Sequence, residues 1–202
     1  MSFEFDNKTE DEKKREMQRI IDEISKCEKC ELHKTRKKPV PGEGSVNSRI
    51  MLIGEAPGRN EDEQGRPFVG QAGKFLNQLL KEAGIRREEV YITNIIKCRP
   101  QNNRDPTEKE IKSCSPYLDK QLNIIKPKAI ITLGNYATKY ILRKFKLKEE
   151  SISKIHGKKY KINNLIFNTK IMPSYHPAAA LYNPNLKQTI IDDFKKIREE
   201  LK

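Results

Sequence analysis

The sequence predicts an α/β fold, a three-layer α/β/α sandwich around a short, mainly parallel sheet. Short apolar runs rich in β-branched residues lie at 50–53, 90–96 and 128–134, and each is long enough for one buried strand. Segments with helical spacing of apolar residues separate these runs, and a glycine-rich loop joins the first run to its helix. Strands that alternate with helices form a mostly parallel sheet with helices on both faces.

Size and composition favour one globular domain. The chain has 202 residues, 35% of them hydrophobic and 34% charged, which is enough for a core of its own. We expect a single domain over 1–202, with 1–9 frayed. No apolar run reaches the length of a membrane span, and the first residues lack a basic region followed by an apolar one, so we expect a cytoplasmic protein.

The net charge is +13, which favours an anionic partner. Nucleic acid is the leading candidate, and an acidic membrane surface is the weaker one. A lysine- and glutamate-rich composition is also typical of a hot or AT-biased host, and the lysines are spread along the chain rather than gathered in one tract.

The first element expected is an amphipathic helix from Glu10 to Lys26. One face of it carries apolar residues three or four apart, namely Met17, Ile20, Ile21 and Ile24. The helix ends at Cys27, and a basic, turn-rich stretch at 34–42 leads to the first strand.

A glycine-rich loop follows that first strand. The strand at 50–53 breaks at Gly54, and the loop runs to Gly70 with Glu55 and Phe68 in it. Glycine lets main chain approach a ligand closely, and strand, loop and helix together build pockets in open α/β sheets. The alternative is a surface loop that only reverses the chain. Apolar residues at helical spacing then predict a helix closed by Gly84, with Phe75, Leu76, Leu79, Leu80 and Ala83 on its inner face.

The middle of the chain predicts a second strand and a capped helix. The strand at 90–96 runs into a polar loop at 101–106. Thr107 and Glu110 form the capping box that begins the next helix. Pro116 falls inside that helical pattern, and we expect it to kink or restart the helix.

Three further elements complete the chain. After the strand at 128–134, we expect Asn135 to cap a helix that ends at Lys144. A small hairpin is expected across 158–167, followed by a strand at 169–177 that carries His176 into a loop. The closing helix spans 187–202, with Ile190, Ile191, Phe194, Ile197 and Leu201 on its inner face.

Three polar side chains each lie just beyond a strand end. Glu55, Asn94 and His176 come from loops far apart in the sequence. Because the carboxyl ends of parallel strands meet at one rim of the sheet, we expect these three side chains to share one pocket.

The four cysteines suggest a metal site. Cys27 and Cys30 form a C-x2-C pair, and Cys98 and Cys114 are separated by fifteen intervening residues. Four thiolates suit either zinc or a [4Fe–4S] cluster, and the open second pair favours the cluster. With all four bound, the cluster would act as a structural staple. The alternatives are a core thiol at Cys114 with an ordinary strand-end residue at Cys98, or disulfides, which fit the inferred compartment poorly.

Several motifs together resemble the family 4 uracil-DNA glycosylases. The resemblance covers residues 20–200, and its motifs are G-E-A-P-G-R-N-E-D at 54–62, G-R-P-F-V-G-Q-A-G-K-F-L at 65–76, T-N-I-I-K-C-R-P at 93–100 and H-P-A-A at 176–179. It implies a three-layer α/β/α fold and a [4Fe–4S] cluster on the four cysteines. It also implies a monofunctional enzyme that hydrolyses the N-glycosidic bond of uracil flipped out of DNA.

The resemblance also assigns roles to residues of this sequence. Phe68 would stack on the uracil, and the amide of Asn94 would read its edge. His176 would donate a hydrogen bond to uracil O2 as charge builds on the departing base. Glu55 would stabilise the cationic sugar and orient the water, while main chain at Glu55–Pro57, including Ala56 and Pro57, would hold the ring.

Comparison with family 1 enzymes leaves two points open. The positions of the water-positioning aspartate and of the thymine-blocking tyrosine are here Ala56 and Gly58. Water activation therefore moves to Glu55 or to no side chain, and the exclusion of thymine is unassigned.

DNA would be held through its phosphates by basic side chains. Arg99, Arg104 and the basic loop at 34–38 are the candidates, and Leu181 is the candidate wedge for the gap left by the flipped base. The resemblance implies a monomer that needs no nucleotide cofactor and admits a sliding clamp as a partner. The competing functions are a non-catalytic, metal-stapled nucleic-acid-binding module and an electron-transfer protein. The module would need no convergent carboxylate, amide and imidazole, and electron transfer fits the charge poorly.

Overall fold

A five-stranded sheet forms the centre of the protein, in a computed structural model that describes residues 8–199. The strands are β1 (Ile50–Gly54), β2 (Val90–Asn94), β3 (Ala129–Leu133), β4 (Tyr160–Asn163) and β5 (Asn168–Ser174). Their order is β2-β1-β3-β5-β4. All neighbours pair in parallel except β4, which pairs antiparallel with β5 as the outer half of a hairpin. The mainly parallel sheet predicted from the sequence is confirmed.

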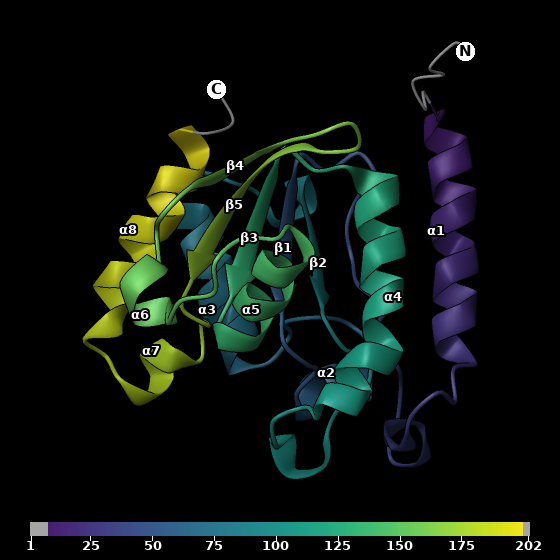
Figure 1. The fold of residues 1–202 in the computed structure, drawn as a ribbon. Coiled ribbons are helices and arrows are strands. Elements are labelled where there is room, and N and C mark those ends of the chain that lie inside the picture. Colours follow the sequence, from purple (N-terminus) through teal and green to yellow (C-terminus); the bar gives the residue numbers. More distant parts are fainter. Residues whose placement is uncertain (1–7, 200–202) are drawn as a thin grey trace.

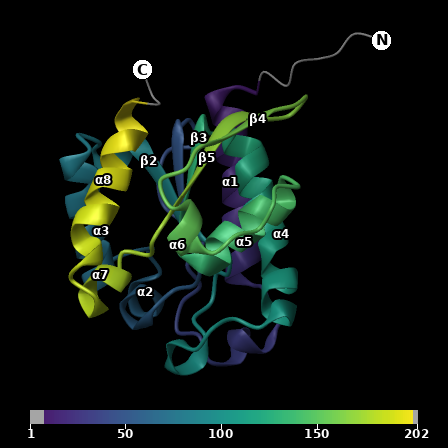
Figure 2. The same ribbon diagram turned by 60° about the vertical axis from the view of Figure 1, so that its left-hand side comes forward.

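Helices cover both faces of the sheet, which gives three layers (Figures 1 and 2). One face carries α1 (Glu10–Ser25), α4 (Glu108–Ile125) and α5 (Asn135–Lys144), and the other carries α3 (Gln71–Glu82) and α8 (Leu186–Glu199). Short helices lie in the connections, namely α2 (Arg59–Gln64), α6 (Ile152–Ile155), α7 (Ala179–Tyr182) and the 3₁₀ turns η1 (Glu31–Lys34), η2 (Arg87–Glu89) and η3 (Gln101–Asn103). No helix within residues 8–199 has the length and apolar character to cross a bilayer.

The central strand shows why the sheet needs two helical layers. Every residue of β1 is buried. Met51 and Ile53 pack into the core beneath α1, α4 and α5, whereas Ile50 and Leu52 pack into the core beneath α3 and α8. Successive side chains of a strand point to opposite faces, so an uninterrupted apolar run fits only a strand that is covered on both sides.

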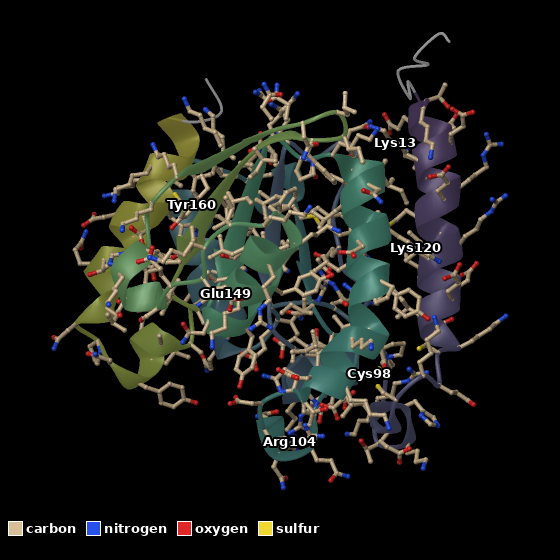
Figure 3. All side chains as sticks on the ribbon, viewed as in Figure 1. Lys13, Cys98, Arg104, Lys120, Glu149 and Tyr160 are labelled. Carbon is tan, nitrogen blue, oxygen red and sulfur yellow. The ribbon has the colours of Figure 1, made fainter. Side chains whose placement is uncertain are left out.

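The amino-terminal helix packs against α4 along the predicted face. Met17, Ile20 and Ile24 are buried, and Lys120 on α4 reaches Glu23 on α1 at 2.6 Å (Figure 3). Thr9 caps α1 in a capping box with Glu12, so the fraying expected over 1–9 does not apply to Thr9. The rest of that expectation, over 1–7, falls outside the described residues, as does Leu201 at the other end.

Three local expectations differ from the structure, the first in the glycine-rich loop. That loop contains the short helix α2. Gly58 is its N-cap, and Gly65 ends it in the left-handed conformation at φ 74°. The acidic residues Glu61 and Asp62 lie in its first turn, where they complement the helix dipole. The glycines thus bound a helix instead of lengthening a loop.

The other two differences concern the starts and interiors of helices. Gly134, at φ 91°, is the N-cap of α5, and Asn135 is its first residue. The Asn135 side chain instead accepts a hydrogen bond from the backbone of Ile152 at 3.4 Å. The helix α4 runs unbroken through Pro116, so the expected restart is wrong. Proline removes one N–H, and the packing of α4 against the sheet through residues such as Leu118 outweighs that loss. The capping box of Thr107 and Glu110 is confirmed.

Candidate functional site

A cavity of about 460 Å³ opens at the carboxyl ends of β1, β2 and β5. Glu55, Asn94 and His176 all line it. Parallel strands end at the same rim of the sheet, so three short loops bring these side chains together. Glu55 and His176 are 121 positions apart in the sequence. The shared pocket expected from the sequence is confirmed. The other predicted residues that line it are Ala56, Pro57, Phe68, Arg104 and Leu181.

The Asn94 amide is buried and partly without a partner. Asn94 is the last residue of β2 and only 2% exposed, yet its Oδ1 makes no hydrogen bond. Its backbone carbonyl is held by the buried Lys97, whose Nζ donates to it at 2.7 Å. Leaving a buried amide oxygen unpaired costs about 1–3 kcal/mol. The cavity therefore presents an acceptor that a ligand with an N–H can satisfy.

Gly54 makes room for that amide. It ends β1, directly beside Asn94 in the sheet register. A β-carbon at Gly54 would lie 2.4 Å from Asn94 Oδ1 and 2.8 Å from the ring of Phe68. Only glycine lets these two side chains approach the end of β1.

The Phe68 ring forms an apolar wall of the cavity. Phe68 has a positive φ of 50°, which is uncommon and strained for a residue with a side chain. Its ring centroid lies 5.5 Å from that of His176. Close behind it, a β-carbon at Gly73 would lie 1.9 Å from the Phe68 carbonyl oxygen, so only glycine fits at this position in the first turn of α3.

Two charged side chains hold the strained Phe68 loop in place. Glu61 Oε1 accepts hydrogen bonds from the backbone N–H groups of Val69 and Gly70, at 2.8 and 2.9 Å. Arg87 donates to the carbonyl oxygens of Pro67 and Phe68, at 2.7 and 3.3 Å. Because these bonds fix the backbone on both sides of Phe68, they offset its strain. Neither Glu61 nor Arg87 is marked for this role by any pattern in the sequence.

His176 is neutral, with one defined tautomer. Its Nδ1 accepts a hydrogen bond from the backbone N–H of Ala178 at 3.1 Å, so the ring proton is on Nε2. Burial lowers its pKa to about 4, against a small opposing effect of Glu61. A neutral imidazole with Nε2–H is a hydrogen-bond donor that carries no charge. Gly134 stands against it, where a β-carbon would lie 3.2 Å from His176 Cβ.

Glu55 is the carboxyl group of the cavity. Burial, and secondly the charge of Asp105, raise its pKa to about 7. Asp105 is itself fixed, because Tyr136 Oη donates to it at 2.8 Å. At neutral pH Glu55 therefore exchanges a proton readily, as a general base requires.

Of the three predicted DNA-binding residues, Arg104 and Leu181 line the cavity and Arg99 does not. Arg104 lines the cavity and makes two hydrogen bonds to Glu110, at 2.7 and 2.9 Å. Arg99 does not line it, and its side chain bonds Asn103 at 2.8 Å. Leu181 lines the cavity from α7 and is 50% exposed. Figure 3 shows Arg104 and Cys98 at the same end of the molecule.

All four cysteines line a second pocket, between the end of α1 and α4. Arg36 donates to Cys98 Sγ, and the backbone N–H of Lys97 donates to Cys114 Sγ, each at 3.2 Å. Burial raises the pKa of Cys30, Cys98 and Cys114, the last to about 12. Thiolates in this pocket therefore need a cation close by.

The spacing of the sulfurs bears on which group they fit. Among the described residues, no three His, Cys, Asp or Glu side chains lie close enough together to bind one metal ion. Four sulfurs around a single zinc, at ~2.3 Å from it, would stand within roughly 4 Å of each other. A four-iron cluster gives each thiolate its own iron, so its thiolates stand farther apart. Four thiol donors that line one pocket are compatible with such a cluster.

Comparisons with known proteins agree with one another. The family model for the uracil DNA glycosylase superfamily matches residues 41–202. A type-4 uracil-DNA glycosylase of Saccharolobus solfataricus is 54% identical over 183 residues, which cover 90% of this chain and 85% of that protein. The type-4 enzyme of Archaeoglobus fulgidus is 49% identical, over 89% of this chain and 90% of that protein. The type-4 enzyme of Thermotoga maritima is 40% identical, over 92% of this chain and 95% of that protein.

Proposed function

Since the chain belongs to the uracil-DNA glycosylase superfamily and to its type-4 members, we propose that the cavity at the ends of β1, β2 and β5 is where it removes uracil from DNA. The chain is a DNA repair glycosylase, and a non-catalytic binding module is not favoured. The observation that carries the assignment of the cavity is the unpaired, buried Oδ1 of Asn94 beside the ring of Phe68.

Asn94 reads the edge of the base. Its Oδ1 accepts from uracil N3–H while its NH₂ group donates to O4. Cytosine presents the opposite pattern, with an acceptor at N3 and a donor at C4, so it would leave the amide unpaired. Phe68 supplies the face on which the ring stacks, and main chain of Glu55, Ala56 and Pro57 borders the same space.

His176 stabilises the leaving group. As the bond between C1′ and N1 breaks, its electron pair moves into the uracil ring and negative charge builds on O2. His176 Nε2–H donates to that oxygen. Because the imidazole is neutral, it stabilises the negative charge on O2 through a hydrogen bond and not as a positively charged counter-ion.

Glu55 acts on the sugar side of the bond. Its ionised form stabilises the positive charge that develops at C1′ and orients a water molecule. The water oxygen bonds to C1′, and a proton passes from the water to the Glu55 carboxylate. The uracil anion takes up a proton from solvent and Glu55 releases the one it received, so the products are free uracil and an abasic site. Within residues 8–199 no lysine lines the cavity, which fits a hydrolase that leaves the strand uncut.

Basic side chains hold the DNA, and Leu181 fills the space that the base leaves. Arg99, Arg104 and the loop at 34–38 bind phosphates, which makes affinity fall with salt. Leu181 stands exposed on α7 at the mouth of the cavity, where an apolar wedge can replace the extruded base.

Cys27, Cys30, Cys98 and Cys114 hold a [4Fe–4S] cluster. When bound, the cluster supplies structure rather than chemistry, because four protein ligands leave no iron open to substrate. The cysteines tie the end of α1 to the segment after β2 and to α4. We further propose a single-domain, cytoplasmic monomer without a nucleotide cofactor, for which a sliding clamp is a candidate partner.

The direct test is release of uracil. The protein is incubated with a labelled oligonucleotide that contains one uracil, without added metal or nucleotide, and the strand is then treated with alkali. We expect alkali-dependent cleavage at the uracil alone and none without alkali. Glu55→Gln and Asn94→Ala proteins that fold but cleave as fast as wild type would refute the assignment of the cavity.

A further inference from the structure

Tyr182 is an aromatic side chain at the mouth of the cavity that the reaction described above does not use. It is 88% exposed, yet it lines the cavity together with Leu181. Nothing among the described residues forms a hydrogen bond, an ion pair or a ring contact with it. A large, unpartnered aromatic face is costly to expose to water, and this one stands where substrate enters.

The backbone beneath Tyr182 is ordered. The chain from His176 onwards folds into consecutive turns: Ala179 N–H donates to the His176 carbonyl at 2.8 Å, and Leu181 N–H to that of Ala178 at 3.0 Å. Asn183 N–H donates to the Ala179 carbonyl at 2.8 Å, and this bond closes α7. Tyr182 is therefore presented on the same short support that positions His176.

Other exposed apolar side chains lie elsewhere. Leu165 and Ile166, at 96% and 60% exposure, belong to the turn between β4 and β5, at the opposite end of the sheet from α7 (Figure 1). The exposure of Leu181 and Tyr182 is thus concentrated at the cavity.

We propose that Tyr182 is a stacking platform for the base next to the flipped uracil in the same strand. This inference rests on the proposed function of the cavity and adds a subsite for a neighbouring nucleotide. Because Tyr182 itself borders the cavity, its ring lies within reach of the strand that delivers the uracil. Leu181, one position earlier, fills the gap in the stack, and Tyr182 covers the base beside that gap.

Such a platform works without a second strand. Stacking on an aromatic ring tolerates any base, because every base has a flat face, and each stack contributes about 1–3 kcal/mol. The protein should therefore hold a neighbouring base of single-stranded DNA as firmly as one in a duplex. The alternative occupant is the orphaned base of the opposite strand, which exists only in a duplex.

The test removes each stacking partner separately. Wild type, Tyr182→Ala and Tyr182→Phe are compared on single-stranded oligonucleotides, and on the same strands annealed into duplexes, whose uracil has normal neighbours or abasic spacers on either side. We expect Tyr182→Ala to lower kcat/KM about 5- to 150-fold on the normal strand, and Tyr182→Phe to stay within about twofold of wild type. With the spacer in place of the stacked neighbour, wild type and Tyr182→Ala should become equal.

Binding provides a second readout. The sequence contains no tryptophan, so Tyr182→Trp introduces a single tryptophan. Its emission, excited selectively over that of the tyrosines, should be quenched by an uncleavable 2′-fluorinated uracil strand but not by the strand with the spacer. Leu165→Ala, which removes an equally exposed apolar side chain far from the cavity, should leave both readouts unchanged.

The possible outcomes distinguish the proposed function of the cavity from the proposed role of Tyr182. A wild type that releases no uracil overturns the function of the cavity. A wild type that is active, with Tyr182→Ala equally active on the normal strand, overturns the platform alone. A loss confined to duplex substrates and insensitive to the spacer assigns Tyr182 to the orphaned base and overturns the same-strand platform.

Discussion

Gly54 and Asn94 end neighbouring strands in register, and a β-carbon on Gly54 would lie 2.4 Å from Asn94 Oδ1. The smallest residue at the end of β1 thus sets the position of the amide at the end of β2. An amide that reads a base must be held to within fractions of an ångström, because a displacement of about 1 Å can cost on the order of 100-fold in rate.

Gly54→Ala should therefore lower uracil release with little loss of fold. The new methyl group must push the Asn94 amide or the Phe68 ring out of place. We expect kcat/KM on uracil DNA to fall on the order of 100-fold, while the far-UV circular dichroism stays that of wild type. Unchanged kcat/KM would show that the site tolerates the displacement.

Asn94→Asp should lower uracil release and weaken the rejection of cytosine. An aspartic acid in this apolar setting is neutral over part of the pH range. Its O–H can then donate to cytosine N3 while its other oxygen accepts from the amino group. Release is measured on matched uracil and cytosine strands. Asn123→Asp, on an exposed position of α4, is the control, and cytosine release no higher than in wild type counts against the role of Asn94.

The pH dependence of catalysis should follow Glu55. Its pKa is raised to about 7 by burial and by Asp105, so the ionised form that assists the reaction accumulates as pH rises through 7. We expect kcat/KM to rise across this range in wild type and to be low and flat in Glu55→Gln. Removal of the neighbouring charge in Asp105→Asn should move the midpoint to lower pH. A midpoint that stays in place would exclude Asp105 as a cause.

The same group should make stability depend on pH. The folded pKa of Glu55 lies above its ordinary value of 4.5, so between about pH 4.5 and 7 the native state keeps a proton that the unfolded state releases. Stability from this group is thus full below pH 4.5 and is lost as pH rises through 7. Relative to wild type, Glu55→Gln should gain in Tm at pH 8 compared with pH 4, as followed by thermal melts.

Arg99 and Arg104 should differ in what their loss costs. Arg99→Ala should lower the salt dependence of DNA binding by about one unit of slope and leave stability alone. Arg104→Ala should do the same and also destabilise the fold, because Glu110, whose pKa the Arg104 hydrogen bonds hold at about 2, would lose its partner. The control for DNA binding is Arg143→Ala, because Arg143 lies on α5 and is already paired with Glu149. Equal stabilities of the Arg99 and Arg104 variants would contradict this distinction.

The colour and iron content of the purified protein test the cluster proposed for the four cysteines. As purified, wild type should be brown, with broad visible absorbance and about four irons per chain. Cys98→Ser and Cys27→Ser should lose iron and melt at lower temperature, whereas Ser113→Ala, in the same pocket, should keep its iron. Stoichiometric zinc in place of iron would reject the cluster.

The positions of the main site residues were predictable because they depend on a general rule. Parallel strands end at one rim, and the sequence marks each strand by an apolar run and each end by a glycine or a polar residue. Glu55, Asn94 and His176 lie at three such ends and do share a cavity. The cysteines likewise were found by residue type, and they do share a pocket.

What the sequence could not reveal depends on contacts between distant segments. The tether from Glu61 to the backbone after Phe68 joins two parts of one loop that periodicity does not relate. The pairing of Arg104 with Glu110 is also invisible to a reading by charge alone, which treats every arginine as available for phosphate. A positive φ at Phe68 has no signal in the sequence, since hydrogen bonds with the distant Glu61 and Arg87 hold the backbone around it.

Asn94 and Cys98 are only four residues apart, and Lys97 between them bonds both sides, through Nζ to the Asn94 carbonyl and through its backbone N–H to Cys114 Sγ. A stretch this short has no slack to absorb a shift at either end. Anyone transplanting the base-reading amide into another scaffold would have to carry the cysteine pocket with it as one cassette, and anyone deleting that pocket to obtain a metal-free enzyme would have to rebuild the wall behind the amide.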